Sequence, residues 1–283
     1  MSWALVLLAP EAQLEVIAAE LFDAGALGVE VQDHQIPLMP GTPALPGGQG
    51  RLIAHFGDKA AVLELSQTLG GEALEIAEQD WSVAWRAHHK TMRVGPRSWV
   101  HPPWETPPLA DGEVAVLIDP GMAFGTGAHP TTSLCLERCD ELLRERPGAD
   151  VLDVGTGSGV IALLAARLGA RRVAGTENDE VALRAARKAA ELNGIPSVEW
   201  LLVDDPDGIR GEFGVVIANI LLNTLEELAP GIARRVAPGG RLVLSGLLAA
   251  QGDAAAAAYV AQGLREVARK EREGWLRVEL ERP

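Results

Sequence analysis

The chain has 283 residues, 47% of them apolar, so it is long enough to bury a full core and to form two domains. No apolar run approaches the length of a membrane span, and the apolar start at residues 3–9 lacks a basic leader and is followed at once by Glu11, so we expect a cytoplasmic protein. The formal net charge of −14 argues against a general affinity for nucleic acid.

The first 80 residues predict a βαββαβ unit. Strands are expected at 3–8, 27–33, 51–56 and 73–78, and helices at 10–24 and 59–69. Apolar residues recur at helical spacing in both helices, as at Leu14, Ile17 and Leu21, and they alternate with polar residues in the strand at 27–33. Both helices should cover one face of an antiparallel sheet, which is a ferredoxin-like α+β arrangement.

This first segment also carries most of the negative charge. Residues 1–80 contain 12 acidic residues against two basic ones, Arg51 and Lys59, for a net of −10. Such a surface attracts basic partners, although an acidic surface also serves simply to keep a protein soluble.

Residues 81–112 are predicted to be a packed connector. Four tryptophans lie among five prolines here, and indole rings need apolar contacts that a disordered tether does not offer. We expect a short helix at 84–89, and we assign His88 and His89 to the surface or the connector because no metal-like neighbours lie at recognisable spacing.

Residues 113–283 alternate strands with helices, beginning with a strand at 114–118 and including one helix at 222–236, and end in two closing strands. This pattern predicts a doubly wound, mostly parallel seven-stranded sheet with helices on both faces and a hairpin at one edge. Cys135 and Cys139 stand four apart on one expected helix, and without further ligands they predict buried free thiols rather than a metal site. The sequence does not set the oligomeric state, so a monomer is the default expectation.

The segment DPGMAFGTGAHPTT, residues 119–132, is rich in glycine around one aromatic side chain. Its glycines let the backbone turn Phe124 toward a ligand, and the segment directly precedes the helix that leads to the glycine-rich loop. We therefore expect Phe124, Gly125 and Thr126 to contact a cofactor. His129 has a position that suits a general base, but a loop histidine of this kind more often packs or forms hydrogen bonds.

The segment VLDVGTGSG, residues 151–159, predicts a strand that delivers a glycine-rich loop to the start of a helix. A nicotinamide or flavin site requires G-x-G-x-x-G/A, but here Val160 occupies the place of the last small residue. Asp153, Gly155, Gly157 and Gly159 match D-x-G-x-G-x-G instead. The pattern favours S-adenosylmethionine, whose ammonium group a carboxylate such as Asp153 can hold directly or through water. A tight turn in another kind of α/β protein is the alternative.

Glu177 follows the next predicted strand, 24 positions after Asp153. An acidic residue at the carboxyl end of the neighbouring strand can accept hydrogen bonds from both hydroxyls of a ribose. Together with the glycine-rich loop, Glu177 predicts a nucleoside pocket.

Asn219, at the end of the predicted strand 215–218, is the candidate catalytic residue. Methyl transfer to an amine needs a neutral nitrogen lone pair, and nearby carboxylates favour the charged ammonium form instead. The uncharged amide carbonyl of Asn219 can accept from an amine N–H without this cost. The D/N-P-P-Y motif of nucleic-acid amine methyltransferases is absent from ANILL, which further disfavours nucleic acid as substrate.

The motifs DPGMAFGTGAHPTT, VLDVGTGSG, GTEND, ANILLNTLEELAP and GGRLVLSGLL, in this order behind a βαββαβ unit, resemble the bacterial ribosomal protein L11 methyltransferases of the PrmA type. The likeness spans nearly the whole chain. It implies a substrate-recognition domain at 1–80, the connector at 81–112, and an S-adenosylmethionine-dependent methyltransferase domain at 113–283.

The resemblance further implies methylation of lysine ε-amines and the N-terminal α-amine of a basic ribosomal protein, L11, held by the acidic first domain. It assigns cofactor contacts to Thr132, Gly155, Glu177 and Asn219. Glu177 stands where the family commonly has Asp, and Leu222 ends an NILL segment where NILA is usual, which we expect to narrow the pocket. A methyltransferase for small molecules or nucleic acid, and a non-catalytic ribosome-assembly factor, remain the alternatives.

Overall fold

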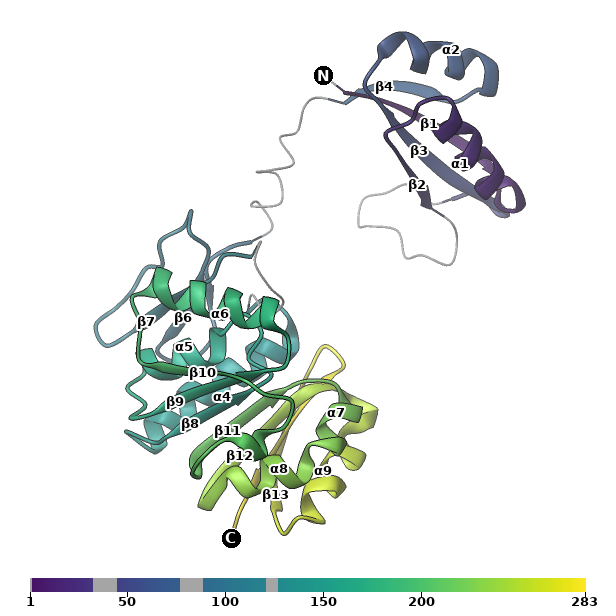
Figure 1. The fold of residues 1–283 in the computed structure, drawn as a ribbon. Coiled ribbons are helices and arrows are strands. Elements are labelled where there is room, and N and C mark those ends of the chain that lie inside the picture. Colours follow the sequence, from purple (N-terminus) through teal and green to yellow (C-terminus); the bar gives the residue numbers. More distant parts are fainter. Residues whose placement is uncertain (1, 33–44, 77–88, 121–126) are drawn as a thin grey trace. The chain divides into compact units, whose positions relative to one another are not determined.

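The computed structural model describes residues 2–32, 45–76, 89–120 and 127–283 (Figure 1). The chain forms two compact units, Met1–Ala87 and His88–Pro283. The described part of the expected connector, from His89 onward, therefore belongs to the second unit rather than forming a separate segment. The short helix expected at 84–89 lies outside the described residues except for His89.

The first unit has the expected βαββαβ order. Its elements are β1 (Ser2–Pro10), η1 (Glu11–Gln13), α1 (Leu14–Asp23), β2 (Gly28–Gln32), β3 (Gln49–Phe56), α2 (Lys59–Leu69) and β4 (Glu72–Ile76). The four strands form an antiparallel sheet in the order β2-β3-β1-β4, which confirms the ferredoxin-like prediction.

The two faces of this sheet differ in character. Alternate residues of β1 and β3, such as Leu5, Leu7 and Phe56, pack with the helices in one core. The opposite face, which we call the open face, carries Leu8 and Leu74, which are 49% and 39% exposed. Strand alternation thus leaves apolar side chains at the surface of the first unit.

The second unit begins with a small sheet that the sequence did not predict. It contains β5 (Met92–Arg93), β6 (Ser98–His101) and β7 (Val114–Leu117), in the order β5-β6-β7. The strand at 114–118 was expected in the large sheet, but it pairs in parallel with β6. The buried side chain of Asn193, at the end of α6, joins this helix to β7. It accepts from the N–H of Leu117 and donates to the carbonyl of Leu117.

The large sheet confirms the doubly wound prediction (Figure 1). Its strands are β8 (Val151–Val154), β9 (Val173–Glu177), β10 (Val198–Leu202), β11 (Phe213–Asn219), β12 (Val236–Leu248), β13 (Arg265–Arg272) and β14 (Trp275–Glu281). They run in the order β10-β9-β8-β11-β12-β14-β13, and all are parallel except β14, which is antiparallel to its neighbours β12 and β13. The strand order changes direction between β8 and β11, which is where this fold class binds ligands.

Helices cover both faces of the large sheet. The helices are α4 (Pro130–Glu145), α5 (Val160–Arg167), α6 (Glu180–Asn193), α7 (Leu222–Glu227), α8 (Ala229–Arg235) and α9 (Gly252–Val260), with short turns η3 (Pro206–Gly208) and η4 (Ala249–Gln251). Residues of α4, α5 and α6 share one core with the sheet, and residues of α7, α8 and α9 share the other. The single helix expected at 222–236 is two helices, because Pro230 lacks an N–H and favours the first turn of a new helix.

Both cysteines are buried free thiols on α4, as predicted. Burial raises the pKa of the Cys135 thiol to about 12 and raises the pKa of Cys139 as well, so neither is a thiolate at neutral pH. Within the described ranges, no helix combines the length and the apolar character needed to cross a lipid bilayer.

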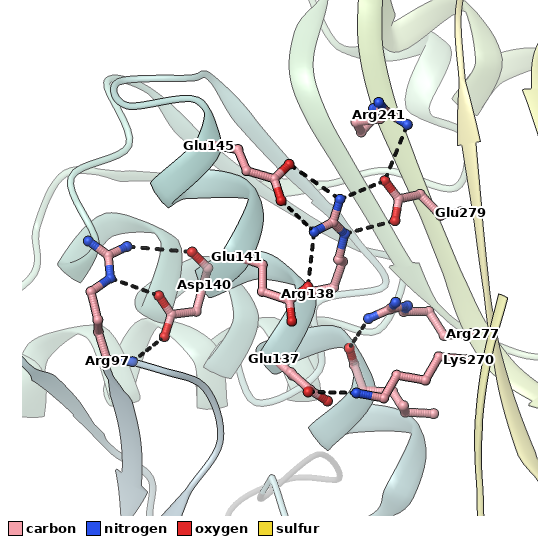
Figure 2. Close-up of polar contacts among 11 residues, drawn as sticks. Arg97, Glu137, Arg138, Asp140, Glu141, Glu145, Arg241, Lys270, Arg277 and Glu279 are labelled. Atoms are coloured by element: carbon pink, nitrogen blue, oxygen red, sulfur yellow. Dashed lines mark hydrogen bonds and ion pairs between the residues drawn. The ribbon is translucent and has the colours of Figure 1, made fainter. Parts of the chain in front are cut away.

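An ionic network joins α4 to the edge hairpin β13–β14 (Figure 2). The carboxylate of Glu279 accepts from Nε and Nη2 of Arg138 at 2.7 and 3.0 Å, and it pairs with Arg241 at 3.5 Å. Arg138 also contacts Glu141 and Glu145 on its own helix. The network fixes α4, whose first turn reaches the cavity described next.

Candidate active site

A cavity of about 400 Å³ lies at the carboxyl ends of the central strands. It is lined by residues at or just after the carboxyl ends of β8, β9, β10, β11 and β12, together with the starts of α4 and β14 and residues of and after α7: His129, Thr131, Val154, Gly155, Thr176, Glu177, Asn178, Val203, Asp204, Pro206, Asn219, Ile220, Leu221, Thr224, Leu228, Gly246 and Trp275. Because β9 and β10 lie on one side of β8, and β11, β12 and β14 on the other, the cavity spans the point at which the strand order reverses.

The glycines of the loop after β8 do different work. Gly155 lines the cavity at φ +68°, and a Cβ there would lie 2.4 Å from Cγ2 of Ile220. At Gly159, φ is +81°, and a Cβ would lie 2.9 Å from the ring of Trp200 and 3.1 Å from Ala186. Gly155 therefore lets Ile220 lie against the loop at the cavity, whereas Gly159 lets α6 and β10 pack closely against the loop.

Glu177 ends β9 and lines the cavity beside the glycine-rich loop. Its Oε2 accepts from the N–H of Gly157 at 2.9 Å, and its Oε1 accepts from the N–H of Asn178 at 3.0 Å. Oε1 also accepts from the N–H of Asp179 at 3.4 Å. These backbone donors fix the carboxylate, and Oε2, with one donor, retains capacity for a further one. Gly157 contributes this backbone donor and is not itself among the residues that line the cavity.

Asp153 lies beneath the loop, 1% exposed, and does not itself line the cavity. Its Oδ2 accepts from Oγ1 of Thr156 at 2.6 Å and from the N–H of Ala162 at 3.2 Å, while its Oδ1 has no hydrogen-bond partner among the described residues. Burial raises the pKa of Asp153 to about 7. An unpaired carboxylate oxygen of this kind retains its capacity to pair with a cation.

Asn219 ends β11 and lines the cavity on the other side of β8. Its Nδ2 donates to Oγ1 of buried Thr132 at 3.2 Å, so the first turn of α4 orients the amide. The carbonyl oxygen Oδ1 is buried and has no hydrogen-bond partner among the residues that the structure describes. Thr132 thus reaches the cavity through Asn219 rather than by lining it. A buried acceptor left open in this way costs free energy unless a ligand donates to it.

His129 and Trp275 form an aromatic pair at the cavity. Their ring centroids are 4.7 Å apart at an interplanar angle of 71°, an edge-to-face arrangement. His129 is the N-cap of α4, with Nδ1 accepting from the N–H of Thr131 at 3.4 Å and lying 2.7 Å from Oγ1 of the same residue. The histidine therefore packs and caps a helix, which is the interpretation that its loop position favoured.

Some expected site residues lie elsewhere or outside the description. Phe124, Gly125 and Thr126 fall outside the described residues. Leu222 was expected to narrow the pocket, but it packs against the core beneath α7, α8 and α9, and Leu221 is the neighbouring leucine that lines the cavity. The helix α7 begins at residue 222 and turns that side chain inward.

Trp275 is a cavity residue that sequence reasoning missed. It stands 56 positions after Asn219 at the start of the last strand, where an apolar residue reads as ordinary core. Only the pairing of β14 with β12, which places Trp275 opposite Leu248, brings it to this edge of the sheet. Within the described part of the chain, no group of three or more His, Cys, Asp or Glu side chains could hold a metal ion.

The site fits a nucleoside that carries a cationic amino acid group. The cavity volume lies in the range of small-molecule sites, about 300–1,000 Å³. Gly155 presents loop backbone without a side chain to the cavity, the Glu177 carboxylate can accept from ribose hydroxyls, and Asn219 presents an acceptor without a partner among the described residues.

Comparisons with known proteins agree with this geometry. The family model described as "Ribosomal protein L11 methyltransferase (PrmA)" matches residues 2–283. Ribosomal protein L11 methyltransferases of Myxococcus xanthus and Pseudomonas paraeruginosa are 41% and 42% identical over 280 and 295 residues, covering 96% and 98% of both chains. A crystal structure of ribosomal protein L11 methylase from Lactobacillus delbrueckii subsp. bulgaricus is 28% identical with a TM-score of 0.63, covering 69% of this chain and 99% of that one.

Proposed function

The chain belongs to the ribosomal protein L11 methyltransferase family, and we propose that it transfers methyl groups from S-adenosylmethionine to lysine ε-amines and to the N-terminal α-amine of ribosomal protein L11. Enzymes of this family are S-adenosylmethionine-dependent methyltransferases. The observation that carries the finer proposal is the uncharged, unpaired carbonyl of Asn219 in the same cavity as Glu177. A ribosomal protein as substrate goes together with a cytoplasmic reaction.

The nucleoside half of the cavity would be formed by the ends of β8, β9 and β10. Glu177 would accept from the ribose hydroxyls, with its carboxylate fixed by the N–H groups of Gly157 and Asn178. Gly155 would let the loop backbone approach the ligand. Asp153, one layer deeper, would supply negative charge near the ammonium of the amino acid group, directly or through water.

The amine half would be formed by the ends of β11 and β12 and by the start of α4. The sulfonium cofactor supplies a methyl carbon that is open to in-line attack by a neutral amine. Asn219 would accept from an amine N–H without stabilising the ammonium form, as a carboxylate would. Thr132 holds the amide in place through Nδ2, so Asn219 would position the nitrogen lone pair instead of removing a proton.

We further propose that the first unit recognises L11. Its described surface carries seven exposed carboxylates, which we call the acidic surface: Glu11, Glu20, Glu30, Asp58, Glu64, Glu72 and Glu75. Glu30 and Glu72 pair across strands with Ile53 and Val6, so both lie on the open face beside exposed Leu8 and Leu74. An apolar surface with acidic residues on it suits a basic protein better than RNA.

The direct test is the mass of each large-subunit ribosomal protein after incubation with the enzyme and S-adenosylmethionine. Mass increments of one methyl or more should appear on L11, and peptide mapping should place them on lysines and the N-terminus. Methyl groups found on RNA or on a metabolite, with none on L11, would contradict the proposal. Cofactor binding with no transfer to any acceptor would instead favour an assembly factor.

A charge reversal tests the docking surface. Glu30→Lys combined with Glu72→Lys should weaken L11 association about tenfold at low salt, because two attractions become repulsions. Affinity of the unaltered protein should also fall as salt rises. Glu64→Lys is the matched control, since Glu64 lies on α2, on the other side of the sheet. Equal weakening by both changes, measured by calorimetry across salt concentrations, would remove the open face from recognition.

A further inference from the structure

We propose that two different groups of residues in the cavity bind amines of different methylation state. Asn219 orients amines that still carry N–H groups, and the His129–Trp275 pair binds the dimethylamine for the last transfer. This proposal rests on the proposed function, because it concerns the amine half of the same cavity. It gives His129 and Trp275 a role in substrate specificity. The proposed contacts of the glycine-rich loop and of Glu177 with the cofactor give these two residues no role.

Asn219 and the His129–Trp275 pair both lie beside the start of α4. Asn219 pairs in register with Ser245 of β12, and three residues further along β12 Leu248 lies opposite Trp275 of β14. Thr132, in the first turn of α4, bonds the Asn219 amide, and His129 caps the same helix and packs on Trp275. The amide and the aromatic pair therefore line one part of the cavity.

Each transfer changes what the amine can offer to Asn219. A transfer forms one N–C bond while the C–S bond breaks and leaves its electron pair on sulfur. The alkylammonium ion formed from a primary or secondary amine then loses a proton to solvent, and the neutral amine can attack again. The number of N–H groups on the neutral amine therefore falls from two to one to none. A neutral dimethylamine has no N–H left to donate, so the Asn219 carbonyl no longer orients it.

An aromatic pair suits the substrate and product that Asn219 cannot hold. Dimethylamine presents two methyl groups, which pack on aromatic rings, and the quaternary ammonium product carries a permanent charge that ring faces attract. The N–H of Thr131 donates to Nδ1 of His129, which holds that imidazole against Trp275 in a defined orientation. Two carboxylates line the cavity, Glu177 at the end of β9 and Asp204 after β10, and both strands lie across β8 from the strands that carry Asn219 and Trp275.

Two forms of L11 separate these two groups of residues experimentally. One is unmodified, and the other has its amines converted to dimethylamines by formaldehyde and borohydride, which preserves their charge for docking. Initial rates on both are measured by intact mass for the unaltered enzyme, Asn219→Ala, Trp275→Leu, Trp275→Phe and His129→Asn. His129→Asn removes the ring but keeps a good N-cap, so it tests the pair without loosening α4.

We expect Trp275→Leu and His129→Asn to lower the rate on dimethylated L11 about tenfold more than the rate on unmodified L11. Trp275→Phe should restore most of that loss, and Asn219→Ala should show the opposite preference. Calorimetry with S-adenosylmethionine verifies that each variant retains a folded cofactor site.

Two results would overturn the proposal: equal loss on both substrates in His129→Asn and Trp275→Leu, or an unaltered enzyme that leaves dimethylated L11 unmethylated. Failure of the unaltered enzyme on unmodified L11 would instead refute the proposed function.

Discussion

Two regions of the second unit differ in how completely their buried carboxylates are hydrogen-bonded. Where α4 meets the small sheet and the edge hairpin, Asp140 and Glu279 have both oxygens occupied: Asp140 accepts from Arg97 and Ser98, and Glu279 from Arg138. At the carboxyl edge of the large sheet, Asp153 leaves one oxygen unpaired among the described residues, as does the amide of Asn219. Both oxygens of these two fold-holding carboxylates are paired, whereas Asp153 and Asn219, near the cavity, each keep one oxygen without a partner among the described residues.

The difference follows from what each region must do. A buried charge is stable only when its partners lie within the protein, so both oxygens of Glu279 are paired by Arg138 without any ligand. A binding site cannot be complete in this sense, because its acceptors must be available to donors that arrive with the substrate. Under the proposed function, the free energy lost at the buried carbonyl of Asn219 would be recovered when a ligand donates to it.

The largest expected effect is on the free energy of unfolding, when the buried carboxylate of Glu279 is removed. Glu279→Ala leaves Arg138 and Arg241 without their buried partner and should lower the free energy of unfolding by about 3 kcal/mol or more. Asp150→Ala is the matched control, since its partner Arg171 is 76% exposed, and it should cost less than about 1 kcal/mol. Denaturant titration measures both, and similar losses would show that burial does not distinguish the two pairs.

Removing the Asn219 amide, whose carbonyl has no partner among the described residues, should affect turnover instead of stability. Asn219→Ala should reduce kcat about 100-fold, because the amine loses its orienting acceptor, while the free energy of unfolding stays nearly constant. Asn193→Ala provides the contrast, since its amide bonds Leu117 and Ala189 and serves only the fold. It should lower stability and spare the turnover of folded enzyme. The comparison fails if Asn219→Ala unfolds the protein or leaves kcat unchanged.

A smaller effect is expected from the pH dependence of Asp153. Its pKa rises from 3.8 to about 7 on folding, so the folded state binds the proton more tightly than the unfolded state between these values. The free energy of unfolding should therefore decrease as pH rises from about 4 to about 7 and receive no further contribution from Asp153 above that. Asp153→Asn should flatten this decrease and add about 1 kcal/mol of stability at pH 8. Thermal unfolding of both proteins across this pH range tests the sign, and a steeper decrease in the variant would refute it.

Local patterns predicted most of the second unit. The alternation of strands and helices and the D-x-G-x-G-x-G spacing led to the sheet, the loop and the position of Glu177, since each depends on residues that are neighbours in sequence. The amide of Asn219 was also predicted at the end of its strand. Its burial and its bond to Thr132 were not, because they depend on how α4 meets β11.

Long-range pairing accounts for what the sequence did not reveal. The strand at 114–117 has the same pattern as a strand of the large sheet, and only its pairing with β6 assigns it to the small one. Trp275 and Asn219 are brought to one cavity by the order of strands, which periodicity does not determine. The break at Pro230 had a local signal, because proline favours the start of a helix over its interior.

The surroundings of Asp140 limit where the sequences of two family members can be joined in a chimera. The buried carboxylate on α4 is enclosed by residues 95–98, and a Cβ at Gly95 would lie 2.6 Å from its Oδ2. A chimera joined near residue 113 would take the carboxylate from one parent and its enclosing loop from the other. A crossover placed ahead of the small sheet, close to residue 88, inherits the two together.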